Sequence, residues 1–176
     1  DYTAGDIGAD TLLHGAFVWV PVPHAKINAV DYAAAGQAEG VVRIVTAADV
    51  PGMNKMGTWT PEQPVFCTDE VNFLGDHLAL VVADTVEHAR AAAKLVRIDY
   101  EELPGIYTMA DGYRKNSFIV HTGRKSGDVE QAKQRPDIVK INVSKEIEPQ
   151  EHACMEPVSA IGMVQDGKTT VYACTQ

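Results

Sequence analysis

The stretch VNFLGDHLALVVADTVEHARAAAKLVRIDY, residues 71–100, carries the clearest local pattern in the chain. A Gly-Asp pair at 75–76 is a turn signal, and residues 78–83 form an apolar run that predicts a buried strand. Asp84 and Glu87 stand at capping-box spacing, so we expect a helix to begin there.

The predicted helix carries a stripe of small apolar side chains. Its members recur at i, i+3, i+4 and i+7: Ala89, Ala92, Ala93 and Val96. Side chains this small imply close packing of the helix on a sheet. Val96, Ile98 and Tyr100 then alternate as a returning strand.

The preceding residues also predict mixed α and β structure. Asp31 should cap a short alanine-rich helix that stops near Gly36 or Gly40. Residues 53–68 lack periodicity and contain glycine and prolines, which is typical of a surface loop. We expect three further strands, within residues 12–20, 25–30 and 41–45.

The composition changes after residue 110. Residues 111–136 mix basic side chains with Gly, Ser and Asp, which indicates a connector with a short ordered piece around residues 118–120. Strand-like segments follow at 138–143 and 158–164, and the turn at 165–168 leads into a hairpin strand at 170–173. The sequence stops at Gln176 in mid-pattern, an odd place for a natural C-terminus.

The composition excludes several classes of protein. With 45% hydrophobic and 22% charged residues, the 176-residue chain is neither disordered, collagen-like nor a disulfide-dense miniprotein. Its 15 Lys and Arg against 24 Asp and Glu give a net charge of −9, which argues against nucleic-acid and anionic-membrane partners. It has no long apolar run and no basic leader, so we expect no membrane span and a cytoplasmic location.

The cysteines show no metal-binding spacing. Cys67, Cys154 and Cys174 form no C-x-x-C pair, which indicates reduced thiols in an intracellular protein, each filling space as a small hydrophobe. A disulfide between Cys154 and Cys174 is an alternative, but nothing in the sequence supports it.

No self-contained active site is evident. The chain lacks G-x-G-x-x-G, P-loop, H-E-x-x-H and G-x-S-x-G motifs, and each of its six histidines is expected to be satisfied or solvated, with His77 and His88 facing water. The densest constellation is QEHACME at 150–156. As an extended strand it would place four side chains on one face, either for metal binding and acid–base work or as a buried polar network: Gln150, His152, Cys154 and Glu156.

In combination, these motifs resemble a known family. The stretch 71–85, the alanine stripe and DYEELP at 99–104 are similar to the hammerhead α/β domain of molybdenum hydroxylases, the xanthine dehydrogenase and aldehyde oxidase family. TAADVPG at 46–52 agrees, and QEH at 150–152 with the final Thr175-Gln176 resembles the opening of the molybdopterin-binding region. The implied fold class is α+β, a hammerhead-type α/β domain followed by the first strands of a second, truncated α+β domain. The implied boundaries are 1–110 for the hammerhead domain, 111–136 for the connector and 137–176 for the start of the molybdopterin-binding domain.

The resemblance also implies a chemistry. The family hydroxylates a purine, N-heterocycle or aldehyde carbon with oxygen from water, at a molybdenum–molybdopterin cofactor. Electrons leave through 2Fe-2S clusters to FAD on partner domains or subunits. The remaining catalytic subunit and a small-molecule substrate would be the other partners, with no nucleic acid and no membrane.

The resemblance assigns few residues. Gln176 matches a glutamine that hydrogen-bonds an oxygen ligand of the molybdenum, while His152 and Glu156 match a structural or channel-lining pattern. The glycine-rich cofactor loop and the catalytic glutamate would lie past residue 176, so we expect a fragment that binds no cofactor and is inactive alone. The alternative is a non-catalytic binding or assembly module that reuses the fold. In a fragment, residues 158–164 and 171–173 should be exposed and could mediate self-association.

Overall fold

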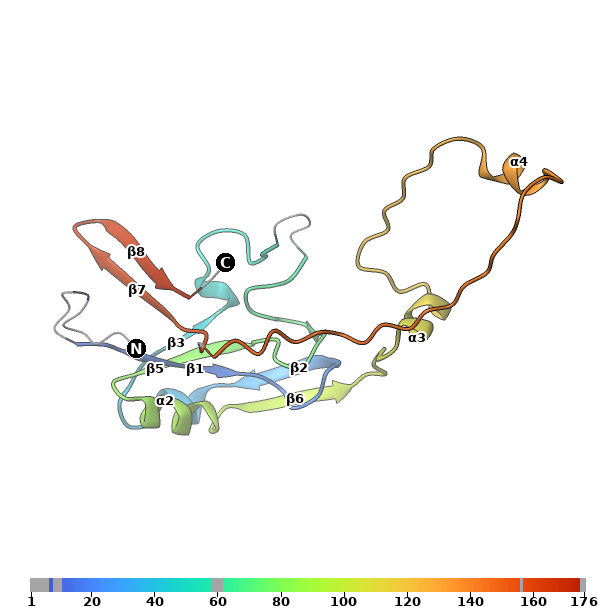
Figure 1. Cartoon of the computed structure of the whole chain (residues 1–176). Helices are drawn as coiled ribbons and strands as arrows, with labels where there is room; N and C mark the ends of the chain where they lie inside the picture. The colour runs from blue at the N-terminus through green and yellow to red at the C-terminus, as the bar shows by residue number, and fades with distance from the viewer. Residues whose placement is uncertain (1–6, 8–10, 58–61, 156, 175–176) are drawn as a thin grey trace. The chain divides into compact units, whose positions relative to one another are not determined.

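The computed structural model describes residues 7, 11–57, 62–155 and 157–174 of the chain (Figure 1). The chain divides into two compact units, residues 1–121 and 122–176. The fold mixes short helices with small sheets, as the sequence predicts.

The first unit contains a three-stranded antiparallel sheet with a buried central strand. Its order is β1 (His14–Val18), β5 (Ala79–Ala83) and β3 (Val41–Thr46), so the apolar run of residues 78–83 supplies the middle strand. Phe17 pairs with Leu80 on one side of β5, and Val45 pairs with Leu80 on the other.

Helix α2 (Val86–Ala93) covers one face of this sheet (Figure 1). Ala89 and Ala92 of its predicted stripe are fully buried, and Ala92 packs in one apolar cluster with Val18 and Val81. The helix cap differs from the prediction. Thr85 caps the helix, its hydroxyl accepting the His88 backbone N–H at 3.1 Å, whereas the Asp84 carboxylate bonds the His88 ring.

A second antiparallel sheet has the order β4 (Glu70–Val71), β2 (Ala25–Asp31) and β6 (Arg97–Glu102). The Gly-Asp turn at 75–76 therefore lies between strands of two different sheets. A bulge interrupts the β2–β6 register between Ile27 and Ala29. A separate apolar cluster fills this half of the unit, formed by Val20, Ala25, Ile27, Cys67, Val71 and Leu78.

The short helices are fixed by side-chain caps. In α1 (Ala33–Gly36) the N-cap position is Tyr32, but the Asp31 carboxylate accepts the Ala33 N–H at 2.9 Å, close to the predicted role. Thr46 and Asp49 form a reciprocal capping box around the 3₁₀ turn η2 (Ala47–Asp49). The segment 53–68 was predicted to be a surface loop. Near its C-terminal end, however, Phe66 and Cys67 are buried.

Two short helices lie in or at the start of the predicted connector, on either side of residues 118–120, where the sequence suggested a short ordered piece. Helix α3 (Met109–Arg114) is capped by Thr108, and α4 (Val129–Lys133) by Asp128. Residues 118–120 form neither helix nor strand, although the Phe118 ring contacts Tyr113 and His121 edge-on.

The second unit ends in the predicted hairpin. Strands β7 (Ala160–Gln165) and β8 (Lys168–Ala173) pair across a two-residue turn in which Asp166 and Gly167 have φ of 51° and 73°. This Asp-Gly turn matches the twist of the strands. Val158, Val164 and Val171 are 90%, 74% and 63% exposed.

The predicted strand at 138–143 is absent from the described structure. Residues 138–144 have no strand partner, and Val139, Ile141 and Val143 are exposed. Alternating apolar residues form a strand only where another strand supplies the backbone hydrogen bonds.

The helix–sheet contact predicts a stability effect. Replacing Ala92 by Leu overfills the contact of α2 with β5 and should lower the free energy of unfolding by about 1–3 kcal/mol in urea titration. The matched control Ala91→Leu lies on the exposed face and should change it by less than about 0.5 kcal/mol. Equal effects of the two substitutions would contradict the packing.

The exposed hairpin predicts self-association, because an isolated two-stranded hairpin is marginal in water. Val164 and Val171 lie on the same face of the hairpin, so replacing both by Lys should reduce concentration-dependent association in sedimentation velocity. Thr169→Lys adds a charge to the same face without removing an apolar side chain and should have less effect. A wild-type chain that stays monomeric at high concentration would refute this prediction.

Candidate functional site

The residues predicted near a cofactor do not form a site in the described structure. Gln150, His152 and Cys154 are exposed, and Gln176 and Glu156 lie outside the described residues. The expected single face is interrupted at Ala153, whose φ of 51° is left-handed and breaks the alternation of a strand.

No metal-ligand cluster is present among the residues described. Within 7, 11–57, 62–155 and 157–174 there is no group of three His, Cys, Asp or Glu side chains that could hold an ion. The described part of the predicted cofactor region therefore supplies no metal site by itself.

Only one of the three cysteines, Cys67, is buried. All three are free; Cys154 and Cys174 are exposed, so the prediction that every cysteine fills space holds only for Cys67. Burial, with the charge of Asp76 and its hydrogen bond to the thiol, raises the pKa of Cys67 to about 12. The thiol therefore stays protonated and inert at neutral pH.

Two histidines beside β5 make side-chain contacts within the first unit. His88 Nδ1 lies 2.7 Å from Asp84 Oδ1, and this hydrogen bond raises the pKa of His88. The prediction that His77 faces water is wrong. Its ring stacks on Phe17 with centroids 3.9 Å apart, its Nδ1 is buried without a hydrogen-bond partner among the described residues, and burial lowers its pKa.

His24 connects three segments. Its Nε2 is 2.8 Å from Glu70 Oε1 on β4, and its Nδ1 is 3.1 Å from the Pro104 carbonyl oxygen after β6. Both partners are acceptors, so both ring nitrogens can donate only in the protonated ring. The hydrogen bond to Glu70, followed by the one to Pro104, raises the pKa of His24.

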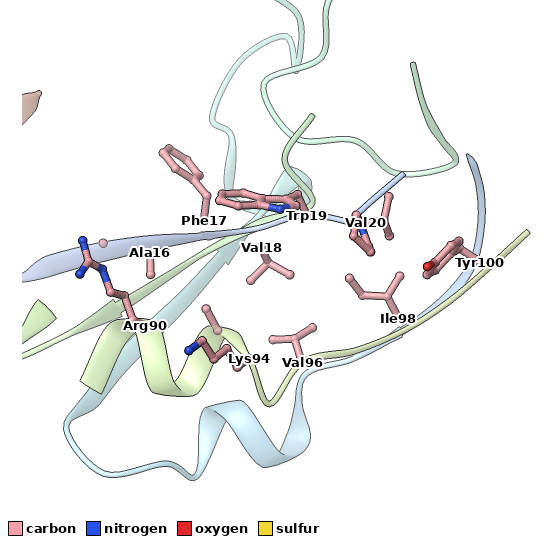
Figure 2. Close-up of a pocket in the computed structure, with 13 residues that line it drawn as sticks. Ala16, Phe17, Val18, Trp19, Val20, Arg90, Lys94, Val96, Ile98 and Tyr100 are labelled. Atoms are coloured by element: carbon pink, nitrogen blue, oxygen red, sulfur yellow. The ribbon is translucent and has the colours of Figure 1, made fainter. Parts of the chain in front are cut away.

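The first unit contains an open apolar cleft of about 770 Å³ (Figure 2). It lies beside β1, over the C-terminal half of α2 and the inward face of β6. Its lining consists of Gly15, Ala16, Phe17, Val18, Trp19, Val20, Pro21, Arg90, Ala93, Lys94, Val96, Ile98 and Tyr100.

Two cations border this apolar lining. Figure 2 shows Arg90 on α2 and Lys94 directly after the helix, with Tyr100 at the end of the cleft away from Arg90. No carboxylate is among the lining residues. The cleft can therefore hold an apolar, extended occupant that presents negative charge to α2.

Comparison with known proteins identifies the fold. The family described as aldehyde oxidase and xanthine dehydrogenase, a/b hammerhead domain, matches residues 2–104. The chain belongs to this family.

Relatives extend the similarity of the hammerhead domain to the rest of the chain. A probable xanthine dehydrogenase subunit from Bacillus subtilis (strain 168) is 35% identical over 180 aligned residues, which cover 97% of this chain and 24% of the relative. The solved aldehyde oxidoreductase of Desulfovibrio gigas is 27% identical with a TM-score of 0.72, over 98% of this chain and 21% of that one. A Cu,Mo-CO dehydrogenase structure is 31% identical with a TM-score of 0.57, over 64% and 14%.

The chain thus spans about a quarter or less of the length of these relatives. In the part of the chain that the structure describes, no helix is long and apolar enough to cross a membrane.

The cations of the cleft were not anticipated from the sequence. Arg90 and Lys94 stand four residues apart, and both flank Ala93 of the small stripe. This i, i+4 spacing on a helix predicts a shared face and could have indicated the pair. The positions of β1 and β6 relative to that helix face depend on tertiary structure, and no local sequence pattern predicts them.

The His24 bridge predicts a pH-dependent stability of the hammerhead domain. Its pKa is raised on folding, so its contribution is fully present below the unfolded value of about 6.5 and is lost as pH rises through the folded value. Glu70→Gln removes the main cause, so the unfolding free energy of wild type minus variant should be largest near about pH 6 and shrink toward about pH 9.

The matched control is Glu101→Gln, an exposed carboxylate on β6 that makes no ion pair among the described residues. A wild-type minus Glu70→Gln difference that stays constant with pH, or that grows with it, would contradict the bridge.

Proposed function

We propose that this chain is part of the molybdopterin-binding subunit of a molybdenum hydroxylase of the xanthine dehydrogenase type. The complete subunit would hydroxylate a purine, N-heterocycle or aldehyde carbon with oxygen from water. The observation that carries the proposal is similarity that continues beyond the hammerhead match at 2–104, to 97% of this chain, in the Bacillus subtilis relative named as a probable xanthine dehydrogenase component.

The proposal assigns the chain a supporting role. The molybdenum–molybdopterin cofactor, when bound, supplies the oxygen-transfer and electron-accepting chemistry, and FAD and 2Fe-2S centres on partner domains or subunits carry electrons away. Most cofactor contacts would come from the remainder of the subunit, so the 176-residue chain alone would bind no cofactor and be inactive. We assign the enzyme to the cytoplasm.

We also propose the division of the chain. Residues 1–110 would be the hammerhead domain, 111–136 the connector and 137–176 the first part of the molybdopterin-binding domain. The exposed apolar residues of 138–144 and of the β7–β8 hairpin support this, because strands that lack a partner here would pair within a complete domain.

The test is expression of the complete reading frame that contains this segment. We expect bound molybdenum by elemental analysis, dye reduction with xanthine, an N-heterocycle or an aldehyde, and incorporation of oxygen from isotopically labelled water into product. A complete protein without molybdenum that oxidises none of these substrates would refute the proposal. It would favour the non-catalytic assembly module.

The proposed contact of Gln176 predicts a specific kinetic defect in that complete protein. Gln176→Ala should lower kcat by about 10²-fold, because one preorganised hydrogen-bond donor at a reacting centre is worth about that much. Molybdenum content should stay at the wild-type level. Gln165→Ala, in the exposed hairpin strand β7, is the control and should retain activity. Wild-type activity of Gln176→Ala would remove the assignment.

A further inference from the structure

Two strand edges lie along the apolar cleft of the hammerhead domain. In the described part of the chain, β1 is an outer strand of its sheet and pairs only with β5, while β6 is an outer strand of the other sheet and pairs only with β2. Among the strands that the structure describes, neither has a neighbour on its second side. Alternate residues of such an edge leave backbone N–H and C=O groups without an inter-strand partner.

The floor of the cleft suits the side chains of an extended segment. Val18 of β1 faces Val96 and Ile98, all from the apolar lining, and Figure 2 shows these side chains between the two strands. Residues 15–21 line the cleft consecutively. At about 3.3 Å per residue this run is at most about 20 Å long, which fits an occupant of about six residues.

The charges of the cleft select the occupant further. Arg90 and Lys94 are exposed and make no ion pair with another described residue, and no Asp or Glu lines the cleft. In a chain of net charge −9, this is a local surface of opposite sign. An occupant that carries a carboxylate toward α2 would find two partners there.

We propose that this cleft binds an extended polypeptide segment by β-augmentation: the segment pairs with the free edge of β1, directs alternate apolar side chains onto Val18 and Ile98, and places a carboxylate beside Arg90 and Lys94. Main-chain hydrogen bonds supply affinity, while the apolar floor and the cations supply specificity. The inference goes beyond the proposed function because it concerns how the hammerhead domain joins another polypeptide segment and makes no use of the reaction.

The test uses the 176-residue chain and a pair of synthetic peptides. The acidic peptide is Thr-Glu-Thr-Val-Thr-Val-Thr-Glu-Thr, which has the same pattern in both chain directions, and the basic peptide carries Lys in place of Glu. Trp19 lines the cleft and is 51% exposed, so its fluorescence reports binding in a Trp59→Phe background, which removes the second tryptophan.

We expect the acidic peptide to bind about tenfold more tightly than the basic one, a difference of about 1.4 kcal/mol, because the acidic peptide gains two exposed ion pairs and the basic peptide meets like charge. Binding should slow hydrogen exchange of backbone amides in 14–18. Arg90→Glu with Lys94→Glu should reverse the peptide preference. Arg97→Glu, an exposed cation on β6 outside the cleft, should leave it unchanged.

Other results would overturn the inference. Equal affinity for the two peptides, no binding of either, or binding that leaves amide exchange in β1 unchanged would each exclude augmentation at this edge. Protection of β1 that rises with protein concentration in the absence of peptide, and disappears in the double charge reversal, would identify a second copy as the occupant. None of these readouts depends on enzymatic activity, so failure here is distinguishable from failure of the proposed function.

Discussion

The close approach of helix α2 to strand β5 is the contact on which the hammerhead domain depends. Ala92 of the helix and Val81 of the strand are fully buried in one cluster with Val18 of β1. Only small side chains on the helix allow this spacing, and burial of the cluster is the main favourable term available to so short a helix. The helix thereby covers β5, the middle strand, and Val18 of the outer strand β1.

The same arrangement creates the cleft. Because β4 and β5 enter different sheets on either side of the turn at 75–76, the first unit is built from two three-stranded sheets rather than one. In the described structure each sheet therefore has an outer strand beside the cleft, β1 in one sheet and β6 in the other. Residues of α2 line the cleft together with residues of these two strands. His24 ties the second sheet together by joining β4 to the end of β6.

Local patterns predicted much of this fold. The apolar run at 78–83, the alanine stripe and the Asp-Gly turn at 166–167 are determined by periodicity and by turn chemistry within a few residues, and the structure confirms them. The cap at Thr85 was missed because Asp84 has equivalent capping chemistry one residue earlier, and its carboxylate is taken by His88. The strand predicted at 138–143 requires a neighbouring strand to pair with, and the described structure places none beside it.

The functional residues were less predictable for the same reason. A site formed by separate segments has no local signature, so His77 was expected in water although its ring stacks on Phe17, sixty residues away in sequence. QEH at 150–152 and Gln176 were predicted as site residues by resemblance to a family. Arg90 and Lys94 could be recognised only once the fold placed them in one cleft with the outer strand β1.

The central claim is that this hammerhead domain serves a larger molybdenum-dependent subunit. The most direct measurement is the mass of the protein purified from its native source, together with its molybdenum and pterin content. The account predicts a polypeptide several times heavier than 19.0 kDa that contains both. A native chain of 19.0 kDa without molybdenum or pterin would contradict it and leave a binding module built on the hammerhead fold.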